Sequence, residues 1–193
     1  MRAANSLSVR YAKNYWLGER RSEELSWKGK TLLRSLRAPT VRDWQLTGLG
    51  LLVFAVTAVP LGFMTGVYRW APDSDLGGLL RVALIALIAP AILEELVFRG
   101  PLVWLQSKRG TAPAWAIGLS LMAFIAWHPL NTVLLMPQAA DLFTDWRFLV
   151  SAAWLGVIAT ILVLRTKSIW TAIVFHWVVV VGWKAFLGAP SFL

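Results

Sequence analysis

Four titratable side chains that could activate water lie in long apolar stretches of this chain, where such groups are costly to bury. Glu94 and Glu95 occur near the end of the second stretch, His128 lies in the third and His176 in the fifth. A glutamate beside a histidine can take a proton from water, and a second histidine can stabilise the oxyanion formed when water attacks a carbonyl group. These residues would be sufficient to hydrolyse a peptide bond without a serine or cysteine nucleophile.

The two adjacent glutamates are expected to have different roles. Glu95 and Arg99 are spaced i, i+4 with the acid first, which is the favourable order for an ion pair on a helix. Glu94 points about 100° away from Glu95 on the same helix and can face a different neighbour. Glu95 is therefore predicted to be structural and Glu94 to be available for chemistry. A simpler interpretation makes the cluster the charged end of a membrane span, and makes each histidine a hydrogen-bonding group between helices.

The elements that must position these groups are membrane-spanning helices. The hydrophobic fraction of the sequence is 58%, above the roughly 45–50% of a soluble domain. Pro90, inside the second apolar stretch, should kink that helix just before the glutamates. About 20 apolar residues cross the hydrocarbon layer of a bilayer. We therefore expect an all-α integral membrane protein with five spans, at residues 46–68, 77–98, 114–136, 147–164 and 168–188.

The charges between the spans predict the orientation of the chain. The N-terminal segment and the loops at 99–113 and 165–167 are basic, whereas the loops at 69–76 and 137–146 are mainly acidic. Basic loops tend to stay in the cytoplasm. The N-terminus is therefore expected in the cytoplasm and the C-terminus outside, and the expected location is the inner (cytoplasmic) membrane of a bacterium.

Two parts of the chain are predicted, a basic tail at residues 1–44 and a transmembrane domain at residues 45–193. The tail is expected in the cytoplasm or at the membrane surface, near anionic lipids. A net charge of +9 is also typical of nucleic-acid-binding proteins. Here the basic residues are concentrated in the tail and in short loops, so nucleic acid is not expected as a partner. The absence of cysteine excludes disulfides, thiolate metal ligands and a cysteine nucleophile.

Three motifs resemble those of the CPBP family, which includes CAAX prenyl endopeptidases, bacteriocin-processing proteins and Abi-type proteins. The sequence EELVFR, which begins at Glu94, follows the pattern EExxxR, and FIAWH, which ends at His128, follows FxxxH. The segment Ser168–His176 resembles the third motif, a membrane segment that carries the second histidine. The order and spacing of these motifs extend the resemblance over residues 77–185.

The resemblance implies a glutamic-type intramembrane endopeptidase that uses no metal and no other cofactor. The family's catalytic glutamate falls on Glu94, its water-activating histidine on His128 and its oxyanion-side histidine on His176. The supporting residues of the first two motifs are Glu95, Arg99 and Phe124. The substrate would be a membrane-associated protein or peptide. The site is expected in a cytoplasm-facing cavity between the second, third and fifth spans.

One position departs from the family pattern. The third motif usually continues as HxxxN, but the residue one turn after His176 is Val180, whose side chain donates no hydrogen bond. Loss of one oxyanion donor elsewhere lowers a rate by roughly 10²–10³. The candidate substitute donors are Asn131, one turn after His128, and Trp183, two turns after His176.

Three other functions stay open from the sequence. A catalytically impaired relative, acting as a membrane scaffold or immunity protein, would explain Val180. Two histidines and a glutamate are also a ligand set for zinc, although the HExxH pattern is absent. Proton transport through the same intramembrane groups is the third alternative.

Overall fold

The computed structural model describes residues 37–189 of the 193-residue chain, and most of this range is helical. Five helical segments are long and apolar enough to cross a membrane, which confirms the predicted all-α membrane fold. Residues 1–36 of the predicted tail lie outside the described residues. The five spans are α2 (Val41–Thr65), a composite of α3 to α5 (Leu76–Arg109), α6 (Ala114–Leu134), α8 (Trp146–Thr166) and α9 (Ile169–Phe186).

The first span begins within the predicted tail because a capping box starts α2 at Val41, five residues before the predicted boundary at 46. The Thr40 side chain accepts a hydrogen bond from the Asp43 backbone at 3.3 Å. The Asp43 carboxylate in turn accepts one from the Thr40 backbone at 2.8 Å. This reciprocal pair satisfies N–H groups that the first helical turn leaves without partners. Asp43 also pairs with Arg37 at 2.7 Å, so these charges belong to the start of the helix.

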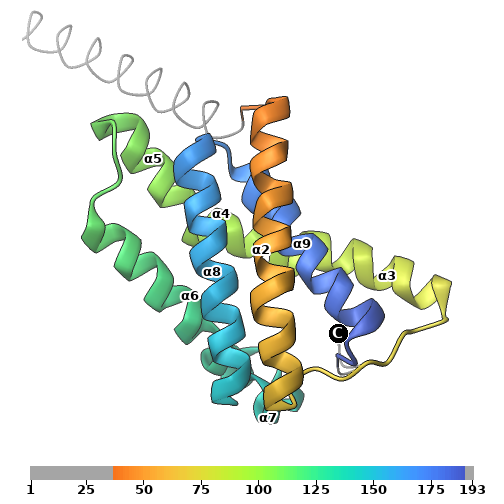
Figure 1. The fold of residues 1–193 in the computed structure, drawn as a ribbon. Coiled ribbons are helices and arrows are strands. Elements are labelled where there is room, and N and C mark those ends of the chain that lie inside the picture. Colours follow the sequence, from red (N-terminus) through yellow and green to blue (C-terminus); the bar gives the residue numbers. More distant parts are fainter. Residues whose placement is uncertain (1–36, 190–193) are drawn as a thin grey trace, which may run out of the picture. The chain divides into compact units, whose positions relative to one another are not determined.

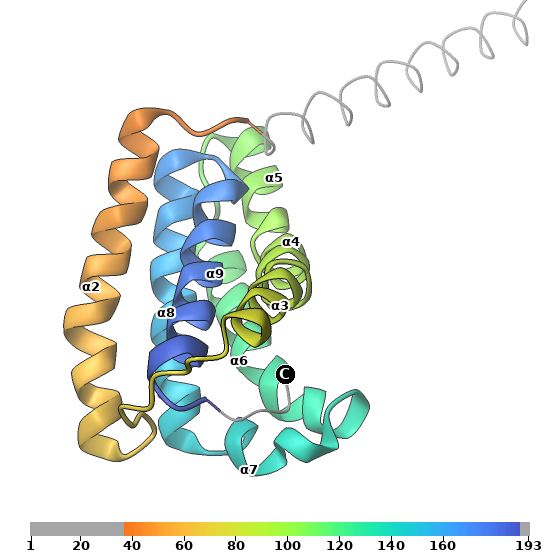
Figure 2. The same ribbon diagram turned by 90° about the vertical axis from the view of Figure 1, so that its right-hand side faces the viewer.

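The second span is bent because a π-helix interrupts it. Its parts are α3 (Leu76–Ala86), η1 (Leu87–Glu94), α4 (Glu95–Phe98) and α5 (Gly100–Arg109). Pro90 lies inside the π-helical part η1, where its missing N–H and its ring prevent regular α-helical hydrogen bonding. The direction of α3 differs from that of α5 in both views (Figures 1 and 2). The predicted kink at Pro90 is therefore present.

Helices α8 and α9 form the centre of the described bundle. α8 packs against α2, α6 and α9, and α9 also contacts α2, α3 and η1. Figure 2 shows α8 and α9 between α2 on one side and α3, α4 and α6 on the other. Fully buried residues such as Val163 and Phe175 come from these central helices. The outer helices expose large apolar side chains, as expected for helices that contact lipid.

Two connections close one end of the bundle. The chain passes from α6 to α8 through the short helices η2 (Pro137–Ala139) and α7 (Ala140–Phe143). The segment between α2 and α3 runs beside the end of α9, with backbone hydrogen bonds in the pairs Arg69–Leu187, Ala71–Phe186 and Asp73–Ala185. Tyr68 in this segment packs directly on Gly62, where a Cβ atom would overlap the tyrosine ring. The ring lies 6.3 Å from that of Trp183, which places Tyr68 inside the bundle.

Candidate active site

A cavity of about 540 Å³ lies between the second, third and fifth spans, and residues of the first and fourth spans complete its walls. This volume falls within the roughly 300–1,000 Å³ of ligand-binding pockets. Glu94, His128 and His176 all line the cavity. The structure therefore brings together the three groups that were predicted to do chemistry, in walls that are otherwise mostly apolar.

Glu95 and Arg99 form the predicted ion pair, with Arg99 Nη1 donating to Glu95 Oε1 at 3.2 Å. Both side chains are fully buried, so the interpretation of this pair as the water-exposed end of a span is wrong. The same glutamate oxygen accepts a hydrogen bond from His176 Nδ1 at 2.9 Å. Arg99 also donates to the Gly156 carbonyl at 3.1 Å and lies 4.1 Å from the centre of the Phe124 ring. Since buried charges require such partners, this sealed network connects the second span to the third, fourth and fifth.

Gly156 permits the close packing of this network. A Cβ atom at this position would lie 2.9 Å from Arg99 Nη2 and 3.0 Å from the Phe124 ring. Contacts this short force a neighbouring group to move. Gly156 was missed from the sequence, because a single glycine in an apolar span carries no pattern that indicates what packs against it.

Glu94 faces the cavity instead of the sealed network. Its Oε1 accepts a hydrogen bond from Trp127 Nε1 at 3.1 Å. Its Oε2 is buried and has no hydrogen-bond partner in the described part of the chain. An indole N–H can only donate, so this contact orients the carboxylate as an acceptor and leaves Oε2 for another donor. Trp127 was also missed from the sequence, because the FxxxH pattern leaves its position open.

The orientation of His128 is fixed by the helix that carries it. Its Nδ1 lies 3.0 Å from the carbonyl oxygen of Phe124. A carbonyl oxygen only accepts hydrogen bonds, so Nδ1 carries the proton and Nε2 is the acceptor. The rings of Phe124, Phe143 and Phe148 pack edge-on around the imidazole, with centroid distances of 5.1, 5.5 and 5.3 Å. His128 thus reaches the cavity in one tautomer, with a nitrogen able to bind water.

His176 is held by Glu95 and not by Glu94. Because an ionised carboxylate only accepts, the 2.9 Å contact with Glu95 Oε1 assigns the proton of His176 to Nδ1. The other nitrogen, Nε2, remains for the cavity that this histidine lines. A carboxylate that orients a functional imidazole in this way is a recurrent arrangement in hydrolases. The role of Glu95 therefore extends beyond Arg99, to which the sequence had assigned it.

Both candidate substitute donors line the same cavity. Trp183 Nε1 is buried and has no hydrogen-bond partner among residues 37–189. Asn131 Oδ1 is in the same situation, and Asn131 Nδ2 lies 3.9 Å from Met136 Sδ, which is a weak acceptor. Val180 is also part of the wall and its side chain contributes no donor. Among these candidates, the N–H of Trp183 therefore has no partner in the described residues, whereas the Asn131 amide nitrogen already donates to a weak acceptor.

The cavity occupies one half of the bundle. On the third to fifth spans, its lining residues begin at Phe124 in α6, end at Leu155 in α8 and begin at His176 in α9, and so extend from the middle of each helix toward the end near α7 (Figure 1). Lys108 and Arg109 at the end of α5, and Arg165 and Lys167 at the end of α8, lie toward the opposite ends of these helices, whereas Arg99 is not a loop residue and is buried in the sealed network. A cytoplasmic N-terminus and a cytoplasm-facing cavity are therefore incompatible, so the two predictions cannot both hold.

The fold and the cavity define a polytopic membrane protein with a buried carboxylate and histidine site. A family model described as type II CAAX prenyl endopeptidase Rce1-like matches residues 76–182. The chain belongs to this family, which confirms the CPBP resemblance predicted over residues 77–185. The match extends from α3 into α9, so α2 lies outside it. No curated protein and no solved structure matches the chain.

Proposed function

We propose that this protein is an intramembrane endopeptidase that cleaves a membrane-associated protein or peptide with water activated by Glu94 and His128. The observation that carries the proposal is the shared cavity, in which a glutamate oxygen without a partner and two oriented histidines meet. Membership of a CAAX endopeptidase family supports the reaction class. The apolar walls favour catalysis, since hydrogen-bond donors stabilise a developing charge most strongly where bulk water is excluded.

The proposed reaction needs only water and the side chains of the cavity. Glu94 Oε2 removes a proton from a water molecule bound to His128 Nε2, and the water oxygen bonds to the scissile carbonyl carbon. The resulting oxyanion is stabilised by the N–H groups of Trp183 and Asn131 and by His176, which for this step carries protons on both nitrogens, so that Nδ1 donates to Glu95 and Nε2 donates to the oxyanion. Glu94 then delivers its proton to the amide nitrogen as the carbon–nitrogen bond breaks. The products are a carboxylic acid and an amine, and Glu94 is again ionised.

A cleavage assay in membranes tests the proposal. The protein is co-expressed with a panel of membrane proteins that have short C-terminal anchors, and wild type is compared with Glu94→Gln and His128→Ala. We expect a fragment with wild type and a loss of at least about 10²-fold in both variants, at equal membrane insertion. Asp141→Asn, an exposed change outside the cavity lining, should cleave normally. A fragment that persists with Glu94→Gln would contradict the assignment of the base.

The second candidate function is a catalytically impaired membrane scaffold or immunity protein, which the donor-free Val180 in the cavity wall favours. The same assay distinguishes the two functions. Absence of any Glu94-dependent fragment, with all proteins well inserted, would support the scaffold. The proposed reaction uses water and the side chains of the cavity without a metal ion, so cleavage is expected to be insensitive to chelators.

For the location, we propose the inner membrane of a bacterium, with the basic N-terminal end on the cytoplasmic side and near anionic lipids. Five spans and the membrane-protease family support an integral membrane protein. The loop charges support this orientation, and no nucleic acid is proposed as a partner.

A further inference from the structure

The mouth of the cavity is formed by apolar side chains on the outside of the bundle. Leu93, Val97 and Leu135 line the cavity, yet they are 54%, 63% and 67% exposed. Leu93 belongs to η1 and Val97 to α4, and Leu135 directly follows α6. Large apolar side chains exposed on membrane spans contact the hydrocarbon of the bilayer. The cavity therefore has an opening toward lipid, between the second and third spans.

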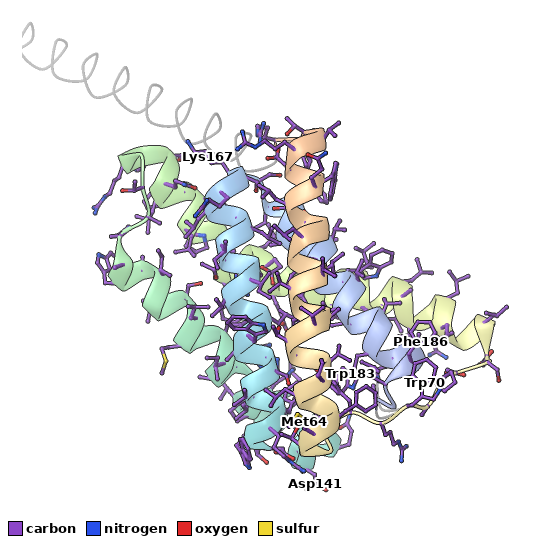
Figure 3. The ribbon with its side chains drawn as sticks, viewed as in Figure 1. Met64, Trp70, Asp141, Lys167, Trp183 and Phe186 are labelled. Carbon is purple, nitrogen blue, oxygen red and sulfur yellow. The ribbon has the colours of Figure 1, made fainter. Side chains whose placement is uncertain are left out.

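This opening lies in the half of the described bundle that contains α7. Phe143 of α7 and residues 148–155 at the start of α8 line the cavity. Figure 3 shows Lys167 at one end of the bundle and Asp141 at the other, with Trp183 nearer to Asp141. The cavity is thus displaced from the middle of the described bundle toward the Asp141 end.

The two ends of the bundle differ in charge. The Asp141 end carries the four acids Asp73, Asp75, Asp141 and Asp145, together with Arg69 and, in the last turn of α9, Lys184. Arg147, at the start of α8, is paired with Asp145. The opposite end carries Lys108, Arg109, Arg165 and Lys167, besides Arg37 and Arg42 at the start of α2. Since Lys and Arg near span ends are retained in the cytoplasm, the Asp141 end is expected on the other side of the membrane.

We propose that the cavity opens in the outer, non-cytoplasmic half of the bilayer and accepts an apolar segment of a membrane-anchored chain directly from the lipid. That a substrate segment occupies the cavity rests on the proposed function, whereas the side of the membrane rests only on the cavity position and the loop charges. Together they define the substrate class as membrane-anchored chains whose scissile bond lies in the outer half of the membrane. Of the two incompatible predictions, this proposal keeps the cytoplasmic N-terminus and rejects the cytoplasm-facing site.

Cysteine labelling tests the side without any need for activity. The chain contains no cysteine, so one introduced cysteine is its only thiol. Thr144→Cys follows Phe143 of the cavity wall, and Ser107→Cys lies in α5 near the opposite end. Both hydroxyls are exposed, and both substitutions leave the loop charges unchanged. In spheroplasts, a membrane-impermeant maleimide should label Thr144→Cys, and should label Ser107→Cys only after permeabilisation. Labelling of Ser107→Cys from outside, or protection of Thr144→Cys, would overturn the proposal.

A pair of substrates tests the occupant. One cleaved segment, identified in the cleavage assay, is placed in the outer half of a host transmembrane helix, and a second version is shifted by ten residues into the inner half. This shift moves the bond by about 15 Å along the helix. We expect at least tenfold faster Glu94-dependent cleavage of the outer version. Faster cleavage of the inner version would overturn the proposal but leave the protease assignment intact. Failure of the protease assignment would instead be seen as no cleavage in the original panel, while the labelling result would still decide the side.

Discussion

Glu94 and Glu95 are neighbours on one helix, yet they belong to two different regions of the molecule. Glu95 lies in the sealed network, where one of its oxygens accepts from both Arg99 and His176. Glu94 accepts one hydrogen bond from Trp127, and each glutamate has one oxygen without a partner among the described residues, but only Glu94 lines the cavity. The boundary between η1 and α4 falls between the two glutamates. Identical side chains thus acquire different roles through the neighbours that other spans supply.

Glu95→Gln should break the sealed network and have the largest effect on stability. It leaves the fully buried Arg99 without its charged partner, and breaking a buried pair in this way costs about 3–5 kcal/mol. Thermal unfolding in detergent micelles measures the loss. Glu94→Gln is the matched control, because it removes the adjacent charge from the cavity wall and should change the free energy of unfolding by less than about 1 kcal/mol. Equal destabilisation by the two variants would refute the division between the regions.

Trp183→Phe tests whether the cavity supplies the oxyanion donor that Val180 lacks. The phenylalanine keeps an aromatic ring beside Tyr68 and Phe148 but removes the N–H, so the turnover number should fall by roughly 10²–10³. Asn131→Ala is tested in parallel, and Trp115→Phe, an exposed change away from the cavity, is the control. If Trp183→Phe and Asn131→Ala each leave turnover unchanged, neither residue is the substitute donor.

Trp127→Phe removes the hydrogen bond that Glu94 accepts and leaves the contacts of Glu95 unchanged. The lost hydrogen bond to a carboxylate is worth about 1.5–3 kcal/mol, which corresponds to a fall of roughly 10–100-fold in turnover. We expect KM to stay close to that of wild type, because the substitution removes an orienting contact and leaves the apolar wall in place. A rise in KM with normal turnover would instead assign Trp127 to substrate binding.

The spans and the meeting of the main groups could be predicted because membranes impose strong rules on sequence. Apolar length gives the five spans, and helical spacing gives the Glu95–Arg99 pair. The high cost of intramembrane titratable groups singles out Glu94, His128 and His176. Each of these inferences uses either local geometry or a requirement that every membrane protein must satisfy.

The contacts between spans could not be predicted in the same way. Neither the hydrogen bond from His176 to Glu95 nor that from Trp127 to Glu94 follows from spacing, because each joins residues on different helices. Their geometry depends on how η1 bends the second span and on how closely the helices approach. The side of the membrane on which the cavity opens could not be predicted from the sequence either, since it depends on which half of each span lines the site.

Gly156→Ala tests this close approach with the smallest change available. The added Cβ would lie 2.9 Å from Arg99 and 3.0 Å from Phe124, and overpacking of this kind costs about 1–3 kcal/mol. Gly118→Ala is the matched control, because a Cβ atom there meets nothing within 4 Å and alanine favours a helix by about 1 kcal/mol. The unfolding midpoint should therefore fall for Gly156→Ala and hold or rise for Gly118→Ala. The turnover number of folded Gly156→Ala should fall less than that of Trp127→Phe, because the added strain arises in the sealed network and not in the cavity wall. A larger fall for Gly156→Ala would show that the sealed network positions the cavity groups as well as holding the spans together.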